Sequence, residues 1–334
     1  MSGEPVSAEL ASAVADGDRR ALARAITLAE SDRLEDRERA RELLEETLPL
    51  AGGAVRVGVT GAPGVGKSTL IEALGVRLVE AGHRVAVLAV DPTSTLSGGS
   101  VLGDKTRMSE LARLERAFIR PSPSGQAAGG VARRTRDAVI LVEAWGADVV
   151  LVETVGVGQS ETAVARVVDV ALLLVGPGAG DDLQGIKRGL VELVDVIAVT
   201  KADGALRDLA ERTRGDYAAA AGLLGHGEAV PVLTCSALAG EGLDEVWQAV
   251  RDRHVELRES GELERHRAEQ AREWMWAEVR EGLVEAALAA APVALRAAEL
   301  EGEVAAGRAL PEAAAQEVVR AMLDDGDDGV DRPA

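Results

Sequence analysis

The sequence predicts an α/β fold in which helices cover both faces of a doubly wound, mostly parallel sheet and helical extensions lie at both ends. Three observations support this. Short apolar segments recur through the middle of the 334-residue chain, helical stretches separate most of them, and the two ends show no strand pattern. Segments that are apolar at nearly every position are typical of parallel strands buried on both faces. Their alternation with helices indicates βαβ units.

Six segments rich in Val, Leu or Ile are the predicted strands. They cover residues 55–60, 84–90, 148–153, 168–175, 194–200 and 229–234. The first fifty residues have helical spacing, and Asp18 follows Gly17 where it could cap a helix. Residues 251–290 lack any strand signal, and a second helical piece is expected from about residue 311 to residue 323.

The composition excludes several classes of function. The chain has 37 Lys and Arg against 56 Asp and Glu, a formal net charge of −19. Because phosphate affinity comes mainly from Lys and Arg, this charge argues against a general nucleic-acid binder and against docking on anionic lipid. No apolar run approaches the roughly 20 residues of a membrane helix, and the first residues show no secretory signal. The single cysteine, Cys235, excludes an internal disulfide and favours a cytoplasmic protein.

The strongest motif is GAPGVGKS at residues 61–68, which matches G-x-x-x-x-G-K-[ST] between a predicted strand and a predicted helix. Its glycines let the backbone curl so that N–H groups point at phosphate, and the helix N-terminus adds a positive dipole end. Lys67 is expected to reach the β- and γ-phosphates, and Ser68 to hold Mg²⁺. The predicted nucleotide-binding residues here are Gly61, Ala62, Pro63, Gly64, Val65, Gly66, Lys67, Ser68 and Thr69.

Two further motifs indicate that the base is guanine. The strand at 194–200 ends in Thr200, Lys201, Ala202 and Asp203, where G proteins carry [NT]-K-x-D. The Asp203 carboxylate would accept hydrogen bonds from the ring N–H and the exocyclic amine of guanine, a pair that adenine lacks. Lys201 would pack along the base and brace the phosphate loop. A third motif, Ser236, Ala237 and Leu238, would offer backbone N–H groups to the guanine O6.

Three acidic residues are candidate magnesium ligands together with Ser68. They are Asp91, Asp104 and Glu153. Asp91 and Glu153 end predicted strands at the carboxyl edge, which is where sheets of this type bind ligands. Carboxylates there could surround Mg²⁺ directly or through water.

Taken together, the motifs of the chain resemble those of a known family. GAPGVGKST, DPTS, GGSVLGDKTRM, ETVGVGQSE, GDDLQGIKRG and TKADG occur in the order found in the MeaB/MMAA-like (ArgK-type) P-loop GTPases, over roughly residues 10–290. The resemblance implies a GTPase chaperone of adenosylcobalamin-dependent acyl-CoA mutases, above all methylmalonyl-CoA mutase. Such a protein gates delivery of the intact cofactor and protects or reactivates the mutase. A homodimer is also implied.

The resemblance assigns parts of the chain by position. It implies a helical N-terminal extension (1–50), a P-loop GTPase domain (51–255) and a helical C-terminal dimerisation arm (256–323). Residues 92–104 and 154–161 would be switches I and II, and residues 177–188 a third switch that responds to the mutase. The last residues (324–334) are acidic and short of apolar side chains, which predicts a disordered acidic tail.

The implied catalytic residues are Lys67, Glu153, Lys187 and Gln159. Lys187 holds the catalytically relevant position of the third switch, and Gln159, three residues after Gly156, is a candidate for orienting the attacking water. No arginine finger is apparent, so we expect slow intrinsic GTP hydrolysis that the mutase accelerates.

Three alternatives remain open. A GTPase that matures nickel enzymes should carry clustered Cys or His ligands, whereas His83, His226, His254 and His266 are scattered. A small-molecule kinase, the older interpretation of ArgK-type proteins, needs a second substrate pocket with a base, which no motif supplies. In a non-catalytic scaffold, GTP binding would set a dimer interface and hydrolysis would be incidental.

Overall fold

The computed structural model describes residues 6–31, 33–91, 108–123, 128–154, 167–179, 194–224 and 230–327. Contacts divide the chain into two compact units, Met1–Ala268 and Glu269–Ala334, and each is described by itself. The finer division of the chain at residues 50, 255 and 323 stays a prediction. Among the described helices, none is both long enough and apolar enough to cross a membrane.

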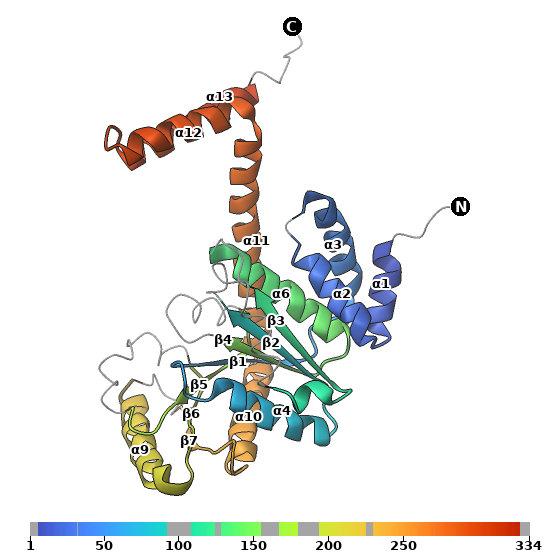
Figure 1. Cartoon of the computed structure of the whole chain (residues 1–334), viewed down its shortest axis with the longest axis vertical. Coiled ribbons are helices and arrows are strands. Elements are labelled where there is room, and N and C mark those ends of the chain that lie inside the picture. Colours follow the sequence, from blue (N-terminus) through green and yellow to red (C-terminus); the bar gives the residue numbers. More distant parts are fainter. Residues whose placement is uncertain are drawn as a thin grey trace. The chain divides into compact units, whose positions relative to one another are not determined.

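The described part of the first unit contains one parallel sheet of seven strands, in the order β3-β2-β4-β1-β5-β6-β7 (Figure 1). Their bounds are β1 (Val55–Gly61), β2 (Val85–Asp91), β3 (Ala117–Pro123), β4 (Val149–Thr154), β5 (Val170–Val175), β6 (Val196–Val199) and β7 (Val232–Thr234). The predicted α/β fold is confirmed, and each predicted strand overlaps an observed one.

The edge strand β3 is not predicted by the sequence pattern. Its sequence, AFIRPSP, contains Pro121 and Pro123 beside the charged Arg120, so it lacks the apolar run of the other strands. Proline cannot donate a hydrogen bond to a neighbouring strand and is therefore tolerated mainly at sheet edges. β3 lies at such an edge, next to β2.

Apolar side chains alternate along the strands and build cores on the two faces of the sheet. Leu172 and Leu174 of β5 belong to the cluster that includes α4 (Lys67–Glu80) and α10 (Leu243–Glu259). Leu173 and Val175 belong to a second cluster with α9 (Arg207–Leu224). This alternation leaves the loops at the carboxyl ends of the strands as the place for polar chemistry.

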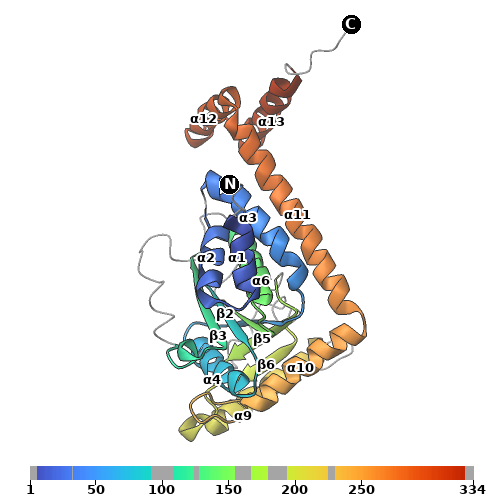
Figure 2. The same cartoon turned by 90° about the vertical axis from the view of Figure 1, so that its right-hand side faces the viewer.

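The N-terminal helices belong to the first unit, where they pack against one long helix. These are α1 (Val6–Ala15), α2 (Arg19–Ala29) and α3 (Leu34–Thr47), and all three contact α6 (Ala128–Ala144), as Figures 1 and 2 show. Asp18 caps α2, as predicted, by accepting from the backbone N–H of Arg20 at 2.7 Å and of Ala21 at 3.2 Å. The indole N–H of Trp145 donates to the Gly17 carbonyl at 2.9 Å, which fixes the start of α2 to the sheet domain.

The second unit is helical. It contains most of α11 (Glu262–Ala289), followed by α12 (Ala291–Ala305) and α13 (Pro311–Asp327). α12 and α13 contact each other, and Arg296 forms an ion pair with Glu317 at 2.5 Å. α13 continues to Asp327, beyond the end predicted near residue 323.

Four charged side chains meet at the amino ends of the strands. Arg56 donates to Glu143 from Nε at 2.6 Å and from Nη2 at 3.0 Å. Arg267 donates to both oxygens of Asp169, at 2.8 and 2.7 Å. The backbone N–H of Arg56 donates to Asp169 at 3.0 Å, which connects the two pairs. Burial lowers the pKa of Arg267, but its hydrogen bonds to Asp169 and the charge of that residue raise it more, so the net pKa lies above its usual value.

We predict that Asp169→Ala will lower the free energy of unfolding by about 3–5 kcal/mol, because it leaves Arg267 charged and without its buried partner. The measurement is urea denaturation followed by circular dichroism. The control is Glu38→Ala, which removes an exposed partner of Arg41 and should leave the midpoint unchanged. Equal midpoints for both variants would show that the buried cluster does not hold the fold together.

Candidate nucleotide-binding site

The predicted phosphate loop leaves the centre of the sheet. β1 lies between β4 and β5, so the chain crosses from one side of β1 to the other between those two strands. In open α/β sheets ligands bind beyond the carboxyl ends of strands at such a switch point. The loop at residues 61–66 begins there and continues directly into α4.

Three glycines of the loop have backbone angles that favour glycine. The φ values are +146° at Gly61, +78° at Gly64 and +105° at Gly66. At Gly61 a Cβ atom would also lie 2.3 Å from the carbonyl oxygen of Leu174 on β5. The spacing of glycines in the motif is therefore required by close packing against β5 as well as by the turn.

Lys67 bends back over the loop that precedes it. Its Nζ donates to the carbonyl of Gly61 at 2.7 Å and to that of Ala62 at 3.1 Å, and the side chain is buried. The ammonium group thus lies at the start of the loop, at the N-terminal end of α4. A fixed cation and a helix N-terminus at one place favour binding of an anion.

Two residues that follow β6 hold the rest of the loop. The hydroxyl of Thr200 donates to the Val65 carbonyl at 2.7 Å, and Nζ of Lys201 donates to the Gly64 carbonyl at 2.8 Å. Lys201 has φ +56° and is the only non-glycine residue with positive φ in the described ranges.

The predicted base-reading residues lie together. Ser236 is fully buried and donates from Oγ to Oδ2 of Asp203, while the same Oγ accepts from the Ala239 N–H at 3.0 Å. Ser236 and Glu241 also pair through their backbones, at 2.8 and 3.1 Å. We call residues 236–241 the base turn. Leu238, at the tip of the turn, is 85% exposed.

Ser68 and Glu153 provide oxygen atoms at the candidate metal site. Oγ of Ser68 donates to Oε1 of Glu153 at 2.7 Å, and Glu153 is buried near the end of β4. Asp91 is the last residue of β2, the neighbour of β4 in the sheet. A hydroxyl and a carboxylate are hard oxygen ligands of the kind that Mg²⁺ prefers, so this donor set fits the ion.

Three predicted residues, Asp104, Gln159 and Lys187, lie outside the described residues, as does most of each predicted switch. The remaining predicted positions are where the motifs place them. Pro63 lies in the phosphate loop, Thr69 in the first turn of α4, and Ala237 in the base turn.

Two arginines outside the predicted motifs also hold the base turn. Arg77 of α4 donates to the Gly240 carbonyl at 2.5 Å, and Arg207 of α9 pairs with Glu241 at 2.5 Å. Sequence patterns do not identify them, because their partners lie 163 and 34 residues away in the chain. An isolated Arg on a helix is otherwise an ordinary surface residue.

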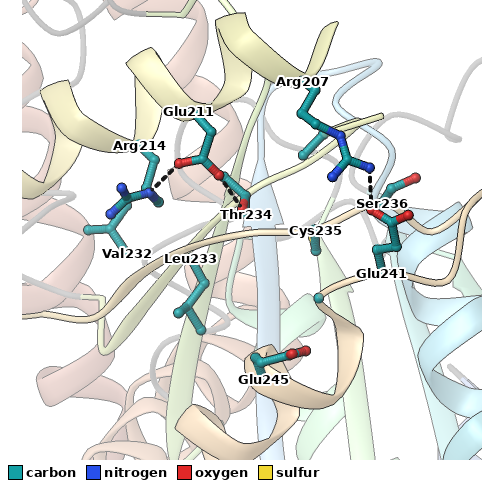
Figure 3. A pocket seen from close by; sticks show the side chains of 12 residues that line it. Arg207, Glu211, Arg214, Val232, Leu233, Thr234, Cys235, Ser236, Glu241 and Glu245 are labelled. Atoms are coloured by element: carbon teal, nitrogen blue, oxygen red, sulfur yellow. Dashed lines mark hydrogen bonds and ion pairs between the residues drawn. The ribbon is translucent and has the colours of Figure 1, made fainter. Parts of the chain in front are cut away.

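A cavity of about 540 Å³ lies beside the base turn, between α9, β7 and α10 (Figure 3). Arg207 and Glu241 pair on one side of it, and Arg214 pairs with Glu211 on the other. Cys235 is buried and lines this cavity, and its burial raises the pKa of the thiol to about 12. The thiol therefore stays protonated at neutral pH, as expected for a packing residue.

Comparisons with known proteins agree with this geometry. The model of the family described as methylmalonyl Co-A mutase-associated GTPase MeaB matches residues 22–292. A putative GTPase of Caulobacter vibrioides is 54% identical over 310 residues, which cover 92% of this chain and 94% of the relative. The mitochondrial methylmalonic aciduria type A homolog of Mus musculus is 47% identical over 282 residues, covering 80% and 68%.

Among solved structures, one described as a LAO/AO transport system kinase is similar over 96% of this chain and 98% of its own. The two are 36% identical, with a TM-score of 0.73. The family model, the relatives and the parallel sheet support the same family. This chain belongs to the MeaB/MMAA-like family of P-loop GTPases, the family that its motifs resemble.

Proposed function

We propose that the chain binds GTP with Mg²⁺ at this site and hydrolyses it to GDP and phosphate in the cytoplasm. The observation that carries the proposal is the direct connection between two motifs far apart in the sequence. Thr200 and Lys201, which precede the base-reading Asp203, donate to carbonyls of the phosphate loop. One ligand that carries a polyphosphate and a guanine base would fit the phosphate loop and the base-reading motif at the same time.

At the phosphate end, the loop N–H groups and Lys67 neutralise charge on the β- and γ-oxygens, where charge changes during transfer. Ser68, Asp91, Asp104 and Glu153 would hold Mg²⁺, which supplies further neutralisation when bound. Water attacks the γ-phosphorus while the bond between that phosphorus and the β,γ-bridging oxygen breaks, which releases GDP and phosphate. Gln159 would orient that water, and Lys187 would join the site from the third switch.

At the base end, Asp203 accepts from the guanine ring N–H and the exocyclic amine. Ser236 supports this role because its hydroxyl donates to Asp203 and so fixes the carboxylate. The N–H groups of Ala237 and Leu238 would meet the guanine O6. An adenine base has an acceptor at N1, a donor amine at C6 and only a C–H at C2, so the polar atoms of the site would lose their partners.

We propose further that the client is an adenosylcobalamin-dependent acyl-CoA mutase, either methylmalonyl-CoA mutase or a close relative. The chain would gate delivery of the cofactor and protect or reactivate the mutase. Membership of a family described as mutase-associated supports this assignment. Slow intrinsic hydrolysis that the mutase stimulates is expected, because the sequence motifs include no arginine finger.

A homodimer is the proposed assembly, formed through residues 256–323. Met275, Val279 and Leu283 lie four residues apart on α11 and are 52%, 38% and 53% exposed, and the neighbouring Trp276 is also exposed. Exposed large apolar side chains on one helix face are typical of protein interfaces, since water-exposed apolar area favours association.

Lys67→Ala is predicted to reduce GTP hydrolysis at least about 100-fold, because the variant loses the cation that faces the β- and γ-oxygens. Phosphate release at saturating GTP measures the effect, and Arg41→Ala, an exposed change on α3, serves as the control. A normal rate for Lys67→Ala would remove the phosphate-loop assignment.

Asp203→Asn is predicted to exchange guanine preference for xanthine preference, by roughly 10- to 100-fold in relative affinity. The amide of Asn offers one acceptor for the xanthine ring N–H and one donor for its O2. Competition between GDP and XDP for the site measures this. Asp208→Asn, on the exposed surface of α9, should keep the wild-type preference. Guanine preference retained in Asp203→Asn would contradict the base assignment.

The client can be tested by co-purification from native cells. We predict that an adenosylcobalamin-dependent acyl-CoA mutase is recovered and that it accelerates GTP hydrolysis. The rate should be compared with and without each recovered mutase. Equal rates would reject stimulation by that partner.

Replacing both Met275 and Leu283 by Glu is predicted to convert the dimer into a monomer, since each change places a charge in the proposed interface. Light scattering after size-exclusion chromatography gives the mass. Leu48→Glu changes a similarly exposed leucine (57%) outside the arm and should leave the dimer intact. A monomeric wild type, or a dimeric double variant, would contradict the proposed interface.

A further inference from the structure

We propose that Arg77 is a positioning residue that sets the base turn at a fixed distance from the phosphate loop. This inference rests on the proposed GTP binding and adds a residue that determines base specificity. Arg77 contacts neither predicted phosphate-binding nor predicted base-reading side chains in any described hydrogen bond. Its effect on the base would pass through the backbone of the turn.

The position of Arg77 in α4 is the first step of the argument. α4 begins at Lys67, directly after the phosphate loop, and Arg77 lies in its last turn. From there Nη2 donates to the Gly240 carbonyl at 2.5 Å, and Nη1 pairs with Asp244 of α10 at 2.6 Å. One rigid helix therefore contacts the phosphate loop at one end and the base turn near the other.

The second step is that, besides the bond from Arg77, the described hydrogen bonds give the tip of the turn one support, from the Ala239 N–H to the Ser236 hydroxyl at 3.0 Å. The two ends of the turn are fixed, because Ser236 and Glu241 pair through their backbones and Arg207 binds the Glu241 carboxylate (Figure 3). Its tip contains Ala237 and Leu238, and Leu238 is largely exposed, so packing of that side chain does not hold it. The bond from Arg77 to Gly240 enters the turn two residues after Leu238.

The third step is the fit between the guanidinium and the turn. Gly240 has φ +70°, and a Cβ atom there would lie 2.8 Å from Nη2 of Arg77. The guanidinium thus rests against bare backbone, in space that a side chain would occupy. A charged donor on a backbone carbonyl forms a stronger and more directional bond than a neutral donor, and it is well suited to fix the turn.

The N–H groups of Ala237 and Leu238 are the groups proposed to meet the guanine O6. Loss of the Arg77 bond should therefore weaken recognition of O6 and leave other contacts intact. The exocyclic amine is read separately by Asp203. The hydroxyl of Ser236, at the fixed end of the turn, donates to that carboxylate.

The test compares Arg77→Met with the wild-type chain in displacement of a ribose-labelled fluorescent GDP. Three competitors separate the contacts. GDP has O6, the ring N–H and the amine, IDP keeps O6 and the ring N–H but lacks the amine, and 2-aminopurine riboside diphosphate keeps the amine but lacks both O6 and the ring N–H. We expect Arg77→Met to lose roughly 5- to 10-fold in affinity for both GDP and IDP, and less than about twofold for the 2-aminopurine nucleotide.

The matched control is Asp244→Asn, which removes the exposed ion-pair partner of Arg77 but leaves the bond to Gly240 available. Its affinity for GDP should stay within about twofold of wild type. Equal losses for all three competitors, no loss for any, or an equal loss in Asp244→Asn would each overturn the role of Arg77. A wild-type chain that does not prefer GDP over ADP would instead overturn the proposed GTP binding, and this inference with it.

Discussion

The site depends on one arrangement of hydrogen bonds, in which side-chain donors hold the carbonyl oxygens of the phosphate loop. Lys67 binds the first two carbonyls, and Thr200 and Lys201 bind those of Val65 and Gly64. Unheld carbonyls are free to turn toward the ligand, where their partial negative charge would repel phosphate. Engaged carbonyls keep the loop in one conformation, which lowers the cost of ordering it on binding.

This arrangement requires the observed strand order. Thr200 and Lys201 follow β6, and only β5 lies between β6 and β1, so the residues after β6 can reach the loop after β1. β5 contributes directly, because its Leu174 carbonyl fills the space beside Gly61. At the opposite ends of the strands, Asp169 precedes β5 and accepts from the backbone N–H of Arg56 on β1. It also accepts from Arg267, near the start of α11. The sheet that positions the site is thus fixed at both ends.

Local patterns in the sequence were enough to predict the parallel sheet and the glycine-rich turn between β1 and α4. Each of these depends on neighbours in the chain: an apolar run, a glycine spacing, or a cap such as Asp18. β3 was missed because its prolines suit only an edge, and edges are a property of the assembled sheet. Arg77 and Arg207 were missed for the same kind of reason, since folding brings their partners from distant segments. The predicted roles of Asp104, Gln159 and Lys187 stay predictions.

Nucleotide preference of the wild-type chain tests the central claim most directly. Titration with GTP and with ATP, each in a non-hydrolysable form and with Mg²⁺ present, gives the two dissociation constants. If Asp203 and the base turn read guanine, GTP should bind at least about 100-fold more tightly, the discrimination expected when buried polar groups lose their partners. Equal affinity, or a preference for ATP, would contradict the account.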